Sequence, residues 1–288
     1  MVVSFIPVMM FLIISQFAKC ETTPPVPRQF PAGVGVDAID LLFHYLPSAQ
    51  GPVESPRNRS FAQQSMQSAC AVNGFTTVRA AGGGFWPDDM AVWRSSPDRW
   101  WTAVSEAIHD AEQANCKLIL TVFWNTFCFP DQVGEPLPMI ANTSSKTWGL
   151  MKDYVSGLVS TVGTSPAVIA WEITNELNLL MDLNMQGRKA SIAPSRGTPT
   201  QRTQADNIST TVGVEFGRNV AELLKSLDPL QRPVSGGYSM PRSSAFHLMN
   251  SFPSGKEDFR TDSESEFREM LGIIHAPFGL ASAHLYAS

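Results

Sequence analysis

One mostly apolar stretch of this 288-residue chain, from Pro166 to Leu177, has polar side chains near its end that could take part in catalysis. The last polar residues of the stretch are Asn175 and Glu176. A short apolar run predicts a strand buried on both faces, as in a parallel sheet covered by helices. In an α/β barrel, chemistry takes place at the carboxyl ends of such strands. A carboxylic acid that is partly buried near a negative charge keeps its proton near neutral pH, so Glu176 is the candidate acid/base.

Glu172 is the other carboxylate of this stretch. It lies four residues before Glu176, which is about 13 Å further down a strand at ~3.3 Å per residue. A carboxylate so deep is more often paired with a buried Arg, so we predict a structural role for it. Strict alternation would also turn Asn175 away from the side of Glu176. Both reach the same mouth only if the strand bends or bulges at its end.

The sequence Trp171-Glu-Ile-Thr-Asn-Glu176 resembles the fourth strand of clan A glycoside hydrolases, in particular the retaining family 5 cellulases and mannanases. The resemblance implies that Glu176 is the general acid/base. It also implies that Asn175 binds the 2-hydroxyl of the sugar, an interaction that strengthens in the transition state. Because both catalytic groups of that family are carboxylates, no metal or organic cofactor is implied.

Three further residues fit the resemblance. Arg79 ends a predicted strand, and in the family an Arg there hydrogen-bonds the nucleophile and keeps it ionised. The alternative is a simple salt bridge at the rim. His284 and Tyr286 are two residues apart on a predicted sixth strand, so their side chains share one face. In the family, a similar His contacts the acid/base or the substrate, and the Tyr holds the nucleophile.

Four residues at predicted strand exits are candidates for a sugar platform: Trp86, Trp124, Asn125 and Tyr238. Each is weaker evidence, because an aromatic residue at a strand end is as often part of the core. The family usually has a His after the third strand, where this chain has Trp124 and Asn125.

Strand and helix patterns alternate along the chain, which predicts an α/β fold with a parallel sheet. The glycines at 82–84 lack the spacing of a dinucleotide-binding turn, so a TIM barrel is favoured over a doubly wound sheet. Predicted strands cover residues 33–37, 75–80, 117–124, 166–177, 233–238 and 279–286, and predicted helices cover 61–72, 96–115, 145–162, 212–227 and 264–274. The loops at 125–144 and 178–206 are expected to be irregular, and the second is long enough to be functional or mobile.

Six predicted strands are two fewer than a (β/α)8 barrel needs. We therefore expect about six of eight units, with two C-terminal units missing as in a fragment or a truncated product. In the family the nucleophile is a Glu on the seventh strand, for which we find no counterpart among these residues. On this expectation, the chain by itself lacks activity.

Composition restricts the partners. The chain is 43% hydrophobic, has a formal net charge of -5 and contains seven Trp residues. Without clustered Lys and Arg there is no surface to neutralise phosphates, so nucleic acid is not expected as a partner. Indole rings suit the apolar faces of sugars, so an oligosaccharide or polysaccharide is the expected partner.

The first 20 residues have an apolar core and small residues before Cys20, which predicts a secretory signal peptide; a membrane anchor is the alternative. Residues 21–32 form a Pro-rich linker, and 33–288 form the barrel domain. Glycosylation sequons begin at Asn58, Asn142 and Asn207 and favour a secreted glycoprotein that does not remain in a membrane.

Three cysteines follow the predicted signal peptide. Cys70 and Cys116 both precede predicted strands and could form a disulfide at the bottom of the barrel, which would leave Cys128 outside the pair, near the top.

The favoured interpretation is a secreted retaining glycosidase that acts on a β-linked polysaccharide such as mannan or β-glucan. A non-catalytic carbohydrate-binding remnant of such an enzyme is the alternative. A barrel of unrelated chemistry is also compatible with the pattern, because fold does not define function.

Overall fold

The computed structural model describes residues 35–46, 58–84, 87–189, 195 and 197–284. Five parallel strands within these residues form one sheet in the order β1-β2-β3-β4-β5. The strands are β1 (Gly35–Asp37), β2 (Thr77–Ala81), β3 (Lys117–Phe123), β4 (Val168–Thr174) and β5 (Val234–Ser235). The parallel α/β fold is therefore confirmed, whereas a TIM barrel with about six of its eight units stays a prediction.

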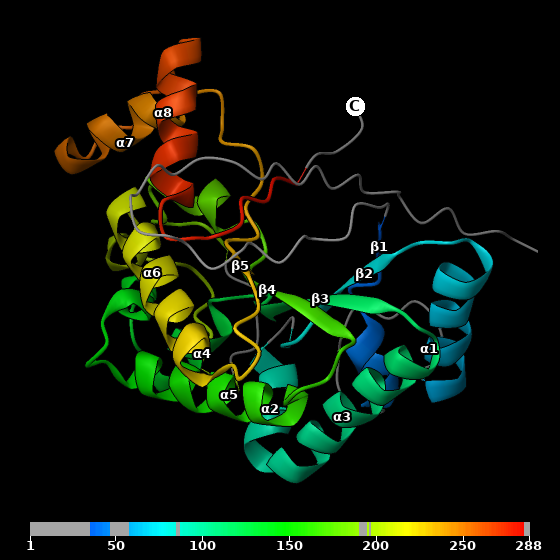
Figure 1. Cartoon of the computed structure of the whole chain (residues 1–288). Helices are drawn as coiled ribbons and strands as arrows, with labels where there is room; N and C mark the ends of the chain where they lie inside the picture. Colours follow the sequence, from blue (N-terminus) through cyan, green and yellow to red (C-terminus); the bar gives the residue numbers. More distant parts are fainter. Residues whose placement is uncertain (1–34, 47–57, 85–86, 190–194, 196, 285–288) are drawn as a thin grey trace, which may run out of the picture.

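Helices connect the strands and cover the outside of the curved sheet. In Figure 1 the helices α3, α5 and α6 follow one another around it, and α3 contacts α5 as α5 contacts α6. The main helices are α1 (Arg59–Met66), α2 (Pro87–Ser95), α3 (Pro97–Gln113), α4 (Cys128–Val133), α5 (Lys146–Val162), α6 (Thr210–Leu227), α7 (Ala245–Ser251) and α8 (Glu264–His275). Shorter helical turns are Leu41–Tyr45, Gln67–Val72, Leu137–Ala141, Leu177–Leu180, Gln204–Asp206 and Phe252–Ser254.

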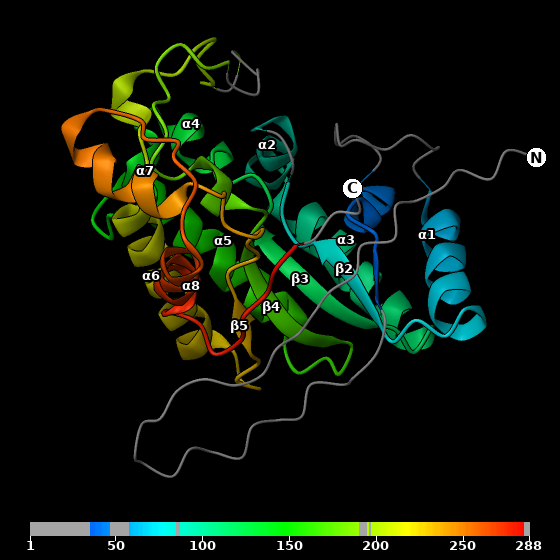
Figure 2. The same cartoon turned by 90° about the horizontal axis from the view of Figure 1, so that it is seen from above.

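Two ends of the sheet are covered differently. Figure 2 shows α1 beside the β1–β2 end, whereas α6 and α8 lie at the β5 end. The helix α7 packs against α8, and α8 packs against α6. The helices α7 and α8 therefore form a separate corner beyond the last described strand.

Side-chain hydroxyl groups and amides define where several helices begin. Ser145 accepts a hydrogen bond from the Trp148 amide and Ser209 accepts one from the Val212 amide, so each caps the helix that follows it. These are the boundaries that the sequence predicted to within two residues.

Alternation along β4 separates two layers. The indole of Trp171 points to the helix side and donates to Asp228 at 2.9 Å. Its neighbour Glu172 points to the opposite, inner side, where it meets Arg79. The apolar core lies mainly between the sheet and the helices and includes Phe123, Tyr154 and Phe216.

The loop prediction for residues 125–144 is wrong in part, because α4 and the turn Leu137–Ala141 lie within it. Prolines favoured a loop, but Pro130 and Pro138 stand in the first turns of these short helices, where a missing amide hydrogen costs nothing. The short helices α2 and α7 were also missed.

The predicted fifth strand is shortened to two residues by the backbone after it. Gly237 has a φ of +68° and turns the chain away from the ladder. The predicted sixth strand, 279–286, is represented in the described residues by a single parallel bridge between Ser239 and His284. Residues 285–288 lie outside the described residues.

A disulfide joins Cys70 and Cys116, the pairing that the sequence allowed without requiring it. Cys128 lies outside this bond, in the buried first turn of α4, where burial raises the pKa of its thiol. No helix among the described residues is both long and apolar enough to cross a membrane.

Candidate active site

The centre of the site is a buried ion pair between neighbouring strands. Arg79 on β2 donates to Glu172 Oε1 on β4 from Nε at 2.8 Å and from Nη2 at 2.5 Å. Thr121 on β3 donates to the same oxygen at 2.6 Å. Both charged side chains are at most 2% exposed. Because an unpaired charge is costly in such surroundings, each of the two requires the other.

This pairing determines the charge of Glu172. Burial by itself would raise the pKa of Glu172, but the charge of Arg79 and hydrogen bonds from His284 and Arg79 outweigh it and lower the pKa to about 2. Glu172 is therefore an anion at any ordinary pH. The prediction that Glu172 is paired with a buried Arg is confirmed.

Arg79 holds other strand ends as well. It donates from Nη1 to Asp37 Oδ2 on β1 at 3.2 Å and from Nη2 to Asn175 Oδ1 at 2.9 Å. The guanidinium also lies 4.4 Å from the centre of the Trp124 ring, a cation–π distance. Burial raises the pKa of Asp37. The positive charge of Arg79 opposes this shift, and the negative charge of Glu172 adds to it. Arg79 thus lies at the centre of the site and does not form a simple salt bridge at the rim.

The backbone turns sharply where β4 ends. Glu176 has the left-handed conformation, with φ 59° and ψ 31°, which is uncommon for a residue other than Gly. Its amide donates to Gly237 O at 2.7 Å, which holds the turn in place. As a result, Asn175 faces Arg79 while Glu176 faces His284, and both lie at the carboxyl end of the sheet.

The bend that the sequence required is therefore present, although its form differs. The irregularity in the β3–β4 pairing falls between Leu118 and Ile119, at the other end of the strand. At the carboxyl end, the left-handed residue takes the place of a bulge. Gly237 allows it, because a side chain at that position would collide with Thr174 O and with the Glu172 side chain.

His284 connects Glu172 on β4 with Glu176, which follows the end of that strand. Its Nδ1 lies 3.1 Å from Glu176 Oε1 and its Nε2 lies 3.3 Å from Glu172 Oε2. Burial lowers the pKa of His284, but hydrogen bonds to the two glutamates outweigh it, and the net shift is upward. An imidazolium there donates to both carboxylates. Glu176 is the member of the three that reaches solvent, with a side chain 16% exposed against 0% for His284.

The predicted sugar platform has only part of the expected geometry. Trp124 lies beside the site through its contact with Arg79. Asn125 instead uses its Oδ1 to accept from the Phe127 amide in the turn that leads to α4. Trp86 and Tyr286 lie outside the described residues.

Tyr238 is not at the mouth of the sheet, contrary to the prediction. Its ring is 1% exposed and packs against His275 and Phe278 at the α8 end, on the helix side. The prediction relied on a strand that continues to residue 238, whereas β5 ends at Ser235 and the chain turns at Gly237. Tyr238 is thus a core residue.

Two residues of the network were missed. Asp37 could have been found, because a carboxylate ends the first predicted strand as Glu176 follows the fourth. Thr121 gave no signal, because Thr is common within strands for its own shape.

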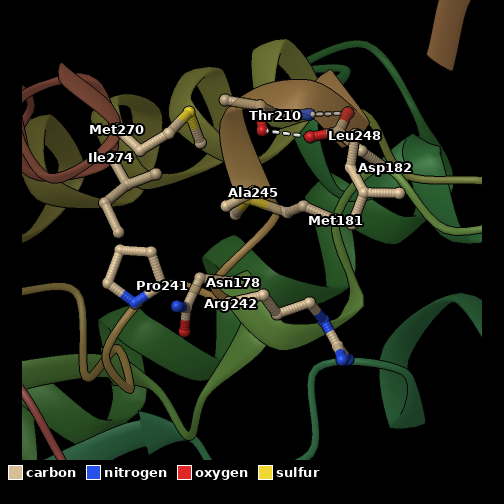
Figure 3. A pocket seen from close by; sticks show the side chains of 10 residues that line it. All are labelled: Asn178, Met181, Asp182, Thr210, Pro241, Arg242, Ala245, Leu248, Met270 and Ile274. Carbon is tan, nitrogen blue, oxygen red and sulfur yellow. Dashed lines mark hydrogen bonds between the residues drawn. The ribbon is translucent and has the colours of Figure 1, made fainter. Parts of the chain in front are cut away.

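Cavities elsewhere in the described residues do not include the charged network. The first, drawn in Figure 3, lies between α7, α8 and the segment after β4, and its volume of about 10 Å³ is room for one water molecule. A larger hollow of about 570 Å³ lies at the end of α2 and beside α4.

Comparison with known proteins gives similarity to solved structures alone. No family model matches the chain, and no curated protein matches it. The endo-1,4-β-D-mannanase of Thermotoga petrophila is 16% identical over 72% of this chain and 56% of that one, with a TM-score of 0.46. The β-1,4-mannanase of Aplysia kurodai is 13% identical over 86% and 70%, with a TM-score of 0.46.

A glycoside hydrolase family 5 mannosidase of Rhizomucor miehei is 12% identical, over 75% of this chain and 53% of that one, also with a TM-score of 0.46. The chain thus spans little more than half of the Thermotoga and Rhizomucor proteins.

Proposed function

We propose that the chain is the larger part of a retaining glycoside hydrolase that cleaves a β-linked polysaccharide such as mannan or β-glucan, with Glu176 as general acid/base. The observation that carries the proposal is the position of Glu176. Its carboxyl group is partly exposed, it follows a buried parallel strand, and His284 contacts it at 3.1 Å. A proton donor of this kind is what the departing oxygen of a glycoside requires.

The arrangement around Glu176 supports proton exchange. An ionised Glu172 and a cationic Arg79 are held in fixed positions below it, and His284 bridges Glu172 to Glu176. When Glu176 gives its proton to the leaving oxygen, the imidazolium of His284 stabilises the carboxylate that forms. Asn175, held by Arg79, lies beside Glu176 and is assigned to the sugar hydroxyl.

A retaining mechanism also needs a nucleophilic carboxylate about 5 Å from the acid. Glu172 does not suit this role, because Oε1 accepts from Arg79 and Thr121 while Oε2 faces His284. We assign the nucleophile to a strand that completes a (β/α)8 barrel outside the residues described here. On this proposal, the 288-residue chain alone does not turn over a polysaccharide.

An added nucleophile tests the proposal on the chain itself. The purified chain is incubated with an aryl β-mannoside or β-glucoside of poor leaving ability, with and without azide. We expect an α-glycosyl azide to form only when azide is present. Azide bonds to the anomeric carbon, the carbon–oxygen bond breaks, and Glu176 protonates the departing oxygen. Glu176→Gln is expected to lower the rate by about 10²–10⁴.

Different results would change the proposal in different ways. If the chain without azide hydrolyses the substrate with retention of configuration, it contains its own nucleophile, and that part of the proposal is wrong. The alternative is a non-catalytic carbohydrate-binding protein. It is favoured if the chain binds an oligosaccharide but forms no product with azide, and if Glu176→Gln leaves that binding unchanged. Glu264→Gln, which changes an exposed carboxylate on α8, is the control for the substitution itself.

We also propose secretion through a signal peptide at residues 1–20, with sugar attached at the sequons. The disulfide between Cys70 and Cys116 supports an oxidising compartment. Two of the acceptor side chains, Asn58 and Asn142, are exposed. The mass of the protein from the medium of eukaryotic cells, before and after glycosidase treatment, tests both points.

A further inference from the structure

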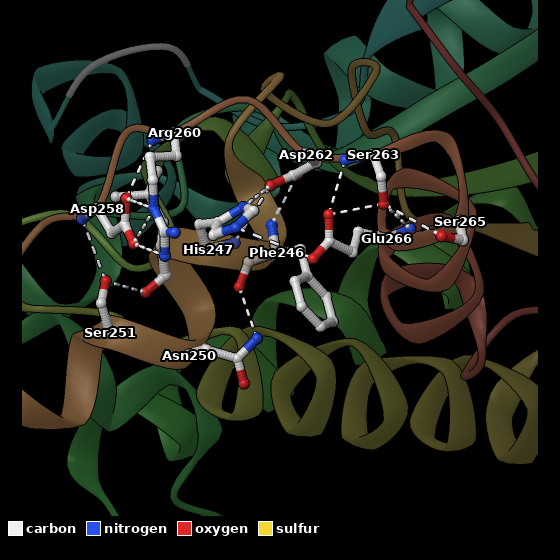
Figure 4. A network of polar contacts seen from close by, with 11 residues as sticks. Phe246, His247, Asn250, Ser251, Asp258, Arg260, Asp262, Ser263, Ser265 and Glu266 are labelled. Carbon is white, nitrogen blue, oxygen red and sulfur yellow. Dashed lines mark hydrogen bonds and ion pairs between the residues drawn. The ribbon is translucent and has the colours of Figure 1, made fainter.

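A histidine lies between two carboxylates at the corner formed by α7 and α8, away from the strand ends (Figure 4). His247 belongs to α7, Asp262 precedes α8, and Glu266 is in the first turn of α8. One nitrogen or oxygen of each residue lies within 4.8 Å of the others. None of the three takes part in the proposed hydrolysis.

The imidazole is oriented by Asp262. His247 Nδ1 lies 2.7 Å from Asp262 Oδ1, and Asp262 Oδ2 accepts from the Phe246 amide at 2.9 Å. The Asp262 side chain is 1% exposed, so its position is well determined by the fold. When Nδ1 donates its proton to this carboxylate, Nε2 presents a lone pair. Histidine ligands of metals are held in this way by a second carboxylate.

Glu266 is oriented just as firmly. Its Oε2 accepts from both the amide and the hydroxyl group of Ser263, each at 2.7 Å, in a capping box at the start of α8. This leaves Oε1 directed towards His247 Nε2 at 3.9 Å. That distance is too long for a hydrogen bond. It is suitable for two ligands of one ion, because zinc lies about 2.0–2.2 Å from nitrogen and oxygen ligands.

We propose that His247 Nε2 and Glu266 Oε1 bind a divalent transition metal ion, with zinc as the expected ion and solvent completing its coordination. Imidazole favours zinc, copper or nickel over calcium and magnesium. The ion can enter from solvent, because the His247 and Glu266 side chains are 17% and 29% exposed. Arg260, which belongs to the same polar network in Figure 4, is paired with Asp258 at 2.7 Å.

A bound ion would join α7 to α8. These helices provide Leu248, Met270 and Ile274 to the small cavity in Figure 3, whose other wall includes Asn178 after β4. The site therefore stabilises the corner that covers the exit of β4. This role is independent of whether the chain hydrolyses a sugar.

The test is a titration of the purified full chain with zinc chloride by calorimetry, repeated with cobalt(II) and followed by visible absorption. We expect saturable binding that His247→Gln and Glu266→Gln each weaken at least about tenfold. Asp262→Asn should weaken it about 10–100-fold through the orientation of the ring. Gln at position 266 can still complete the capping box, so loss of binding in that variant reports the metal ligand rather than the helix.

Two control variants address adventitious binding. Glu264→Gln removes a carboxylate in the same turn of α8, one that pairs with Arg268, and His109→Gln removes an exposed histidine elsewhere. Both should leave the affinity unchanged. The proposal is overturned if zinc does not saturate a site, or if binding survives both His247→Gln and Glu266→Gln. Stability that varies with pH but not with zinc would also overturn it, since a proton rather than a metal would then bridge the pair.

Discussion

Two histidines of this protein lie between two carboxylates, and the surroundings make them different. His284 lies between Glu172 and Glu176 with a side chain that is 0% exposed, whereas His247 lies between Asp262 and Glu266 and is 17% exposed. At the strand ends Arg79 and Glu172 are at most 2% exposed, so Arg79 must neutralise Glu172. At the α7–α8 corner, water or an ion can exchange. Burial therefore commits the first group to a fixed charge pattern and leaves the second open to a ligand.

The largest expected effect is the loss of the buried cation. Arg79→Met leaves Glu172 buried without its partner, and we expect a loss of about 3–5 kcal/mol in the free energy of unfolding. The measurement is urea denaturation at neutral pH. Arg260→Met, which breaks an exposed pair with Asp258, is the matched control and should be indistinguishable from the unchanged chain. Similar losses in both variants would remove the distinction between the two regions.

Acid should destabilise the buried region through Glu172. Its pKa is about 2 in the folded protein, against an ordinary value of 4.5. The resulting stabilisation is complete above pH 4.5 and is lost as the pH falls towards 2, with a magnitude on the order of 3 kcal/mol. Denaturation curves from pH 6 to pH 2 measure this limb. In Glu172→Gln the loss of stability between pH 6 and pH 2 should be smaller. An unchanged loss would mean that other carboxylates cause the acid sensitivity.

Backbone geometry at the strand ends gives a smaller effect. Gly237→Ala combines a positive φ with a collision against Thr174 O and Glu172, and we expect a loss of about 1–3 kcal/mol. Gly255→Ala has a similar φ of +71° and no heavy atom within 4 Å of the added carbon. The difference between the two variants in thermal unfolding isolates the collision. Equal losses would mean that the turn at Gly237 adapts.

The smallest expected effect belongs to the open histidine. With a chelator present, His247→Gln should change stability by at most about 1 kcal/mol, because Asp262 keeps its hydrogen bonds from the backbone amides of Phe246 and His247. His284→Gln, which disturbs hydrogen bonds of buried carboxylates, should cost about 1–3 kcal/mol under the same conditions. Calorimetric unfolding of both variants compares them directly. A larger loss at His247 would reverse the comparison.

Local patterns were sufficient for much of the fold. The apolar runs around residues 117–124 and 166–177 predicted β3 and β4, and apolar spacing predicted α5. These elements depend on contacts between near neighbours in sequence and on burial of one face. The pairing of Cys70 with Cys116 was recognised as possible, because both precede strands, and these strands are adjacent in the sheet.

Elements that depend on distant contacts were less accessible. Tyr238 was placed at the strand exit because it ends the predicted fifth strand, but after the turn at Gly237 its side chain lies in the core. Asp37 and Thr121 joined the site only because β1 and β3 flank β2. No local pattern states which strands will be neighbours.

The sequence by itself determined the parallel α/β character of the chain, the position of Glu176 after a buried strand, and the structural pairing of Glu172 with an arginine. Residue types, periodicity and spacing are sufficient for these features, because each follows from burial and chain geometry. Only the tertiary structure decided that Glu172, His284 and Glu176 form one connected group, and that His247 meets Glu266. The physical reason is that these contacts join segments far apart in the chain, and the packing of the sheet and helices brings them together.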